Sequence, residues 1–188
     1  MTPKKINTTV VWESILLGTT EHTTITTGKD ISVNGRIEGK RAGKSINIEY
    51  HLKIDTSWVI QSFSLDSRLG NPFSVSLHKN KKGEWVDEKG ILLPEFADCT
   101  DIDIMMTPFT NTLPVNRLNL SPGVSEEINV IYVDLKQNRC YPARQRYTNE
   151  GDGIYKYESL QSDFTTLLRI DEHGLVIDYP GIWRRVNF

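Results

Sequence analysis

Apolar and polar residues alternate with a period of two along several short stretches of the chain. In INIEYHLKI, residues 46–54, every second side chain is apolar and those between them are polar or charged. The same alternation recurs in DISVNGRI (30–37), FSVSLHK (73–79) and DFTTLLRID (163–171). It is typical of antiparallel strands that bury one face and expose the other. The chain is therefore predicted to be all-β.

Turn sequences rich in glycine, asparagine and aspartate separate these stretches at short intervals. Examples are TGKD (27–30), EGKRAGKS (38–45), LGNP (69–72) and DEHG (171–174). Short strands joined by such turns predict a meander that forms a barrel, a roll or a sandwich.

Two segments depart from simple alternation. EEINVIYVDLK, residues 126–136, carries apolar side chains on both faces, which predicts a strand covered on both sides. No segment has a long helical stripe, and the region from Pro94 to Met105 is the best candidate for a short helix.

Length and charge limit the classes of protein to consider. A chain of 188 residues with a net charge of −2 fits one domain, residues 1–188, and lacks the basic surface expected of a nucleic-acid-binding protein. It contains no run of 18 apolar residues and no signal-peptide pattern at its start, so a cytoplasmic location without a transmembrane segment is expected. Cys99 and Cys140 have no CxxC partner and are expected to be buried, reduced thiols.

No motif for metal, cofactor or nucleophilic catalysis stands out. The histidines are scattered, GxSxG is missing, and GRIEGKRAG (35–43) lies between two predicted strands, unlike a phosphate loop. We therefore predict no metal site, no cofactor and no catalytic residues of a known pattern. A carboxylate pair is the remaining catalytic possibility, with candidates Glu13, Asp101, Asp103, Asp171 and Asp178.

Aromatic residues and arginines suggest either a filled core or a binding pocket. A large roll can keep a cavity whose aromatic walls and few polar groups hold a ligand. The arginines of the C-terminal half, including Arg144 and Arg146 on one strand face, suit phosphate or carboxylate groups and equally suit ion pairs within the protein.

One block of sequence resembles a known family. Asp101-Ile-Asp103, TPFTNTLP (107–114) and Arg117-Leu118 resemble the signature of the putative glycolipid-binding family of bacterial proteins. Further matching pieces extend over nearly the whole chain and include Trp12-Glu13, Gln145-Arg-Tyr147, Tyr155-Lys-Tyr157, Asp163-Phe164 and Asp178-Tyr-Pro-Gly181. Two departures are Asn116-Arg117, where the family usually has two arginines, and the extended hairpin KNKKGEW at 79–85.

The resemblance implies a single-domain spiral β-roll with a curled antiparallel sheet, similar to the bacterial carriers that move lipoproteins between membranes. It also implies a lipid or glycolipid as ligand.

Two interpretations of residues 107–118 stay open. Thr and Asn side chains satisfy the backbone of an irregular buried segment, which suggests an ordered crossover inside the roll. Alternatively, Thr110, Asn111 and Arg117 line the mouth of a cavity and hold a sugar or phosphate headgroup.

The leading hypothesis is a non-enzymatic protein that binds an amphipathic ligand such as a glycolipid or acyl lipid. Tyr50, Trp58 and Tyr179 are the candidate apolar walls, and Asn111 and Arg117 form the candidate polar end. One alternative is an enzyme or catalytic chaperone that acts on a hydrophobic intermediate in the same cleft. Another is a protein-interaction module that joins chains through sheet edges without a small ligand.

Overall fold

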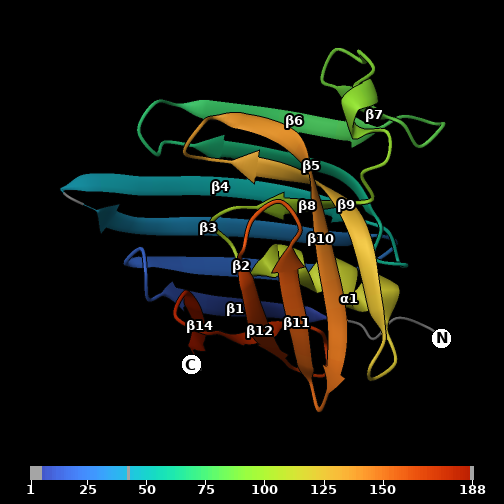
Figure 1. Ribbon diagram of the computed structural model, residues 1–188. Helices are drawn as coiled ribbons and strands as arrows, with labels where there is room; N and C mark the ends of the chain where they lie inside the picture. Colours follow the sequence, from blue (N-terminus) through green and yellow to red (C-terminus); the bar gives the residue numbers. More distant parts are fainter. Residues whose placement is uncertain (1–5, 42, 187–188) are drawn as a thin grey trace.

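A single sheet of 14 strands forms almost all of the part of the molecule that the structure describes (Figure 1). The computed structural model describes residues 6–41 and 43–186. The strands are β1 (Asn7–Ser14), β2 (Thr19–Thr27), β3 (Ile31–Arg41), β4 (Lys44–Ile54), β5 (Ile60–Ser67), β6 (Phe73–Lys79), β7 (Trp85–Asp87), β8 (Asp101–Ile104), β9 (Ser125–Asp134), β10 (Arg139–Gly151), β11 (Ile154–Ser159), β12 (Thr165–Ile170), β13 (Val176–Tyr179) and β14 (Trp183–Val186). The prediction of an all-β chain is confirmed.

The strand order places the first and last strands side by side in the middle of the sheet. It runs β7-β6-β5-β4-β3-β2-β1-β14-β13-β12-β11-β10-β9-β8, so β7 and β8 are the two edges. Among the described strands, every pairing is antiparallel except the one between β8 and β9. The sheet is therefore a curled, unclosed roll and not a barrel.

Alternation along the strands decides which side chains enter the roll. In β4, Ile46, Ile48, Tyr50, Leu52 and Ile54 are buried, while the residues between them are exposed or partly exposed. Strand β9 behaves differently, because apolar residues on both of its faces are buried. Both observations agree with the sequence patterns.

The helix lies later in the chain than predicted. The region Pro94–Met105 contains only a single 3₁₀ turn, η1 (Pro94–Phe96), followed by strand β8. Its Asp-Ile-Asp-Ile run alternates with a period of two, which favours a strand. The helical segment comprises η2 (Phe109–Asn111) and α1 (Thr112–Leu118), and α1 is capped by Asn119 in the left-handed conformation. Within the described residues no helix is long and apolar enough to span a membrane.

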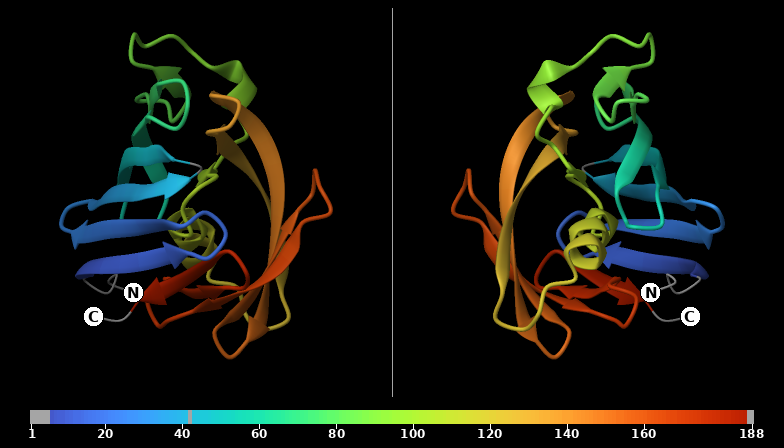
Figure 2. Two further views of the ribbon diagram at one scale, coloured as in Figure 1. Left: turned by 90° about the vertical axis from the view of Figure 1, so that its left-hand side faces the viewer. Right: turned by 90° about the vertical axis from the view of Figure 1, so that its right-hand side faces the viewer.

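Residues 107–118 form the crossover that the parallel β8–β9 pair requires. Parallel neighbours cannot be joined by a tight hairpin and need a connection of a dozen or more residues, usually with a helix. Helix α1 lies between the N-terminal strands and the long strands β9 and β10, where it fills the inside of the roll (Figure 2). Phe109 and Leu113 pack into the larger core cluster, and Val115 packs into a smaller one with Tyr147 and Tyr157.

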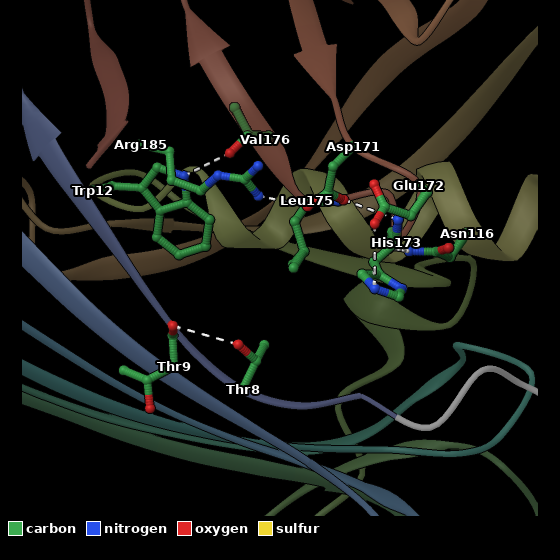
Figure 3. Close-up of polar contacts among 10 residues, drawn as sticks. All are labelled: Thr8, Thr9, Trp12, Asn116, Asp171, Glu172, His173, Leu175, Val176 and Arg185. Atoms are coloured by element: carbon green, nitrogen blue, oxygen red, sulfur yellow. Dashed lines mark hydrogen bonds and ion pairs between the residues drawn. The ribbon is translucent and has the colours of Figure 1, made fainter. Parts of the chain in front are cut away.

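A turn between β12 and β13 holds α1 and the strand ends together (Figure 3). Asp171 accepts hydrogen bonds from the backbone N–H groups of His173 and Leu175, and its Oδ2 is ion-paired with Arg185 at 2.5 Å. The Asn116 side chain of α1 donates to the carbonyl oxygen of His173 at 2.9 Å. The turn thus ties β12 to β14 and to the helix.

Candidate binding site

An apolar cavity of about 380 Å³ opens at one end of the roll. Its walls come from the ends of five connections: the turn after β1, the β3–β4 and β5–β6 hairpins, the segment after β8 and the β9–β10 turn. The lining residues are Leu17, Lys44, Ser45, Ile46, Leu69, Gly70, Met105, Met106, Leu135 and Lys136. We call this space the end cavity.

The end cavity combines an apolar wall with a cationic rim. Leu17, Leu69 and Met105 are partly buried, whereas Lys44 and Lys136 are exposed. Methionine is flexible and polarisable, which lets its side chain adapt to an apolar guest. Ile15 and Leu16, on the turn beside Leu17, are 60% and 64% exposed. The arrangement suits a guest with an apolar body and an anionic or polar end.

A buried carboxyl group, Glu21, lies inside the roll and does not line this cavity. Its Oε1 accepts hydrogen bonds from the hydroxyls of Tyr50 (2.5 Å), Thr107 (2.6 Å) and Thr23 (2.7 Å). Its Oε2 is buried and has no partner among the described residues. Burial raises the pKa of Glu21 to about 7, although the three hydrogen bonds oppose that shift. The network connects β2, β4 and the start of the crossover.

The polar side chains of the crossover are bonded within the protein. Asn111 donates to the carbonyl oxygen of Pro108 and accepts a 2.8 Å hydrogen bond from the Tyr147 hydroxyl. Arg117 forms a 2.6 Å ion pair with Asp101, whose side chain is fully buried. These contacts match the interpretation of 107–118 as an ordered crossover.

The five residues proposed from the sequence lie in different parts of the molecule, and none lines the end cavity. Tyr50 is buried against Glu21, and Trp58 lies in the β4–β5 turn with a φ of 64°. Asn111 contacts Tyr147, and Tyr179 lies 6.3 Å from Phe164, ring centre to ring centre, beside the smaller core cluster. Their roles in binding stay predictions.

Several of the acidic and basic residues considered for chemistry form ion pairs within the protein. Asp101 and Asp171 are bound to Arg117 and Arg185. Arg144 and Arg146 both contact the Glu127 carboxylate at 2.5 Å. These contacts correspond to ion pairing within the protein, one of the two alternatives for these arginines.

A second depression lies on the exposed face of strands β2 to β6. It measures about 600 Å³ and is lined mainly by polar side chains, among them His22, Arg36, Glu49, His51 and Asp66. Tyr50, Leu65 and Val75 also line it, but its walls are less apolar than those of the end cavity, so we regard the latter as the better candidate.

Sequence reasoning did not find Glu21 or the residues of the end cavity. Strand β2 reads TTEHTTITT, with threonines on both of its faces. It therefore lacks the alternation of apolar and polar residues that would have predicted that Glu21 is buried. The end cavity is built from turns, where alternation carries no information. The adjacent Met105 and Met106 were the one available signal.

Comparisons with known proteins agree with this architecture. The crystal structure of a DUF1089 family protein from Pseudomonas aeruginosa is similar, with a TM-score of 0.76 and 34% sequence identity over 88% of this chain and 92% of that chain. No curated protein matches. The family described as putative glycolipid-binding matches residues 9–185. This chain belongs to the putative glycolipid-binding family.

Proposed function

We propose that this protein binds an amphipathic ligand without chemical turnover. The apolar tail of the ligand occupies the end cavity, and its anionic or polar headgroup lies at Lys44 and Lys136. The observation that carries the proposal is the end cavity itself, an apolar space of about 380 Å³ with two lysines at its rim. That volume falls within the range of about 300–1,000 Å³ typical of small-molecule pockets. The family description, glycolipid binding, supports the same class of ligand.

Binding is favoured over catalysis by what the cavity contains. Its ionisable lining groups are Lys44 and Lys136, both exposed. Glu21, the carboxyl group with a pKa of about 7, does not line it. A site for acid–base chemistry needs such a group within hydrogen-bond reach of the substrate.

The first test is native mass spectrometry of the freshly purified protein, repeated after denaturation. We expect an added mass of lipid size that is lost on denaturation. A second assay uses delipidated protein and saturated fatty acids of increasing length. Each buried methylene contributes about 0.8 kcal/mol, so affinity is expected to rise about fourfold per methylene until the cavity is full and then to level off.

Variants locate the ligand. Leu17→Gln places a polar group on the cavity wall, and Lys44→Glu with Lys136→Glu reverses the rim charge. We expect both changes to weaken oleate binding, and only the charge reversal to leave binding of oleyl alcohol intact. Leu167→Gln on β12 and Lys82→Glu in the β6–β7 turn are matched exposed controls. Equal oleate affinity in all of these variants contradicts the proposal.

A further inference from the structure

A separate aromatic cavity of about 250 Å³ lies on β9, β10 and β11. It shares no lining residue with the end cavity. The lining residues are Tyr132, Tyr141, Ala143, Arg144, Gln145, Tyr157, Ser159, Gln161, Ser162 and Phe164. We call this space the aromatic cavity. It is smaller than most pockets for drug-sized ligands, so it suits a small group.

Four aromatic rings line this cavity in two contacting pairs. Tyr132 and Tyr141 lie 5.3 Å apart, ring centre to ring centre, with planes inclined by 43°. Tyr157 and Phe164 lie 6.0 Å apart, inclined by 58°. Phe164 is 39% exposed although it is large and apolar. Aromatic rings attract cations at their faces, and the Arg139 guanidinium already lies 4.8 Å from the centre of the Tyr141 ring.

A carboxylate lies directly behind the aromatic wall. Asp103 is the parallel-sheet neighbour of Tyr132, and its Oδ2 accepts a 2.6 Å hydrogen bond from Gln145, a lining residue. Its Oδ1 accepts a 3.3 Å hydrogen bond from Thr110. Burial raises the pKa of Asp103, against the effect of hydrogen bonds from Gln145, Thr110 and Tyr157. Its charge is therefore poorly solvated.

No arginine, lysine or histidine of the described chain lies within ion-pair distance of Asp103. The nearby arginines have other partners: Arg117 is bound to Asp101, and Arg144, which lines the cavity, shares the Glu127 carboxylate with Arg146. A partly buried carboxylate without a counter-charge gives its surroundings a negative potential. Burial raises the pKa of Tyr132, Tyr157 and Tyr179, and the nearby Asp103 carboxylate adds to that rise.

We propose that the aromatic cavity binds a small organic cation, with a quaternary ammonium group as the best fit. The rings enclose the cation and attract it by their quadrupoles, while Asp103 supplies the opposite charge from behind Gln145 and Tyr157. A neutral sugar gains from the rings but not from the uncompensated carboxylate. This site is independent of the end cavity, whose lysine rim selects the opposite charge.

The test compares two probes of nearly the same shape. Choline carries a trimethylammonium group, and 3,3-dimethyl-1-butanol is its neutral isostere. Isothermal titration calorimetry and saturation-transfer NMR with the full chain are expected to show choline binding tighter by about tenfold or more, the range expected for a desolvated cation–π contact. Equal binding of the isostere, or preference for methyl glucoside, overturns the proposal.

Three variants separate the roles of charge and rings. Asp103→Asn removes the charge and keeps the shape, and is expected to reduce the preference for choline over its isostere to the part that the rings alone supply. Phe164→Leu and Tyr141→Leu open the aromatic wall without touching Asp103, and are expected to weaken choline binding severalfold. Asp98→Asn, at an exposed aspartate, is the control for charge. Thermal denaturation verifies that each variant is folded, and unchanged choline binding in folded Phe164→Leu and Tyr141→Leu contradicts the site.

Discussion

At the residue scale, Glu21 is the group most out of keeping with its surroundings. A carboxyl group that is fully buried, with one oxygen lacking a partner, is held there by three hydroxyl donors. Its ionised form is poorly solvated, which is why its pKa rises from 4.5 to about 7. Folding therefore takes up a proton between these two pH values.

Because folding raises the pKa of Glu21, the free energy of unfolding falls as the pH rises. Below pH 4.5 Glu21 is protonated in both the folded and the unfolded chain, and above pH 7 it is ionised in both. Raising the pH through this window lowers the free energy of unfolding, by about 3 kcal/mol for this group alone. Glu21→Gln is expected to remove that slope and to raise stability at pH 8 relative to the parent.

Urea denaturation at pH 5 and pH 8 measures the effect. Glu126→Gln changes an exposed glutamate and serves as the control, whose pH profile should match that of the parent. The explanation is wrong if Glu21→Gln retains the slope of the parent between these two pH values.

Gly35 provides the second residue-scale prediction. A Cβ atom there would lie 2.0 Å from the Tyr50 ring, the same ring whose hydroxyl binds Glu21. Gly35→Ala is expected to lower the free energy of unfolding by about 1–3 kcal/mol through overpacking. At Gly28 the nearest atom to an added Cβ is 3.8 Å away, so Gly28→Ala should be tolerated. Thermal denaturation of the two variants decides, and equal melting temperatures would contradict this account.

At the scale of elements, the crossover depends on its contact with β10. Asn111→Ala removes the acceptor of the buried Tyr147 hydroxyl, and an unsatisfied buried hydroxyl costs about 1–3 kcal/mol. Tyr147→Phe removes the donor as well and should recover part of that loss in the double variant. Denaturation of the two single variants and the double variant forms the cycle. A stable Asn111→Ala variant with impaired ligand binding would instead favour the ligand-contacting interpretation of this loop.

The strands could be predicted because each one depends on a pattern within a few consecutive residues. The cavities could not be predicted in this way. Alternation in residues 46–54 predicts which side chains of β4 face inward. Apolar residues on both faces of 126–136 predict that β9 is covered on both sides. The position of α1 depends on the parallel pairing of β8 with β9, and no local sequence pattern predicts that pairing. The end cavity brings together turns from distant parts of the sequence, such as those at Leu17 and Met105, which are 88 residues apart.

At the scale of the whole molecule, one antiparallel pair in the described sheet joins strands from opposite ends of the sequence. β1 pairs with β14, with Val11 opposite Val186, while β7 and β8 are not paired to each other. A circular permutant that joins the termini by a flexible linker and opens between the exposed residues Ala97 and Asp98 would turn this pairing into a local one. We expect the permutant to have nearly the parent's stability and to refold faster, since its mean contact separation is lower.

Stopped-flow refolding and equilibrium denaturation test this expectation. A permutant that is stable yet refolds more slowly than the parent would show that the β1–β14 contact does not limit folding.

The two edges of the sheet carry a consequence for association. β7 has three residues and β8 has four, and η1 follows closely after β7 on the way to β8. A free edge templates the addition of a foreign strand only when it offers a long row of unpaired amide and carbonyl groups. Edge strands this short offer few unpaired backbone groups to another chain. The fold therefore disfavours polymerisation by the addition of strands at its edges.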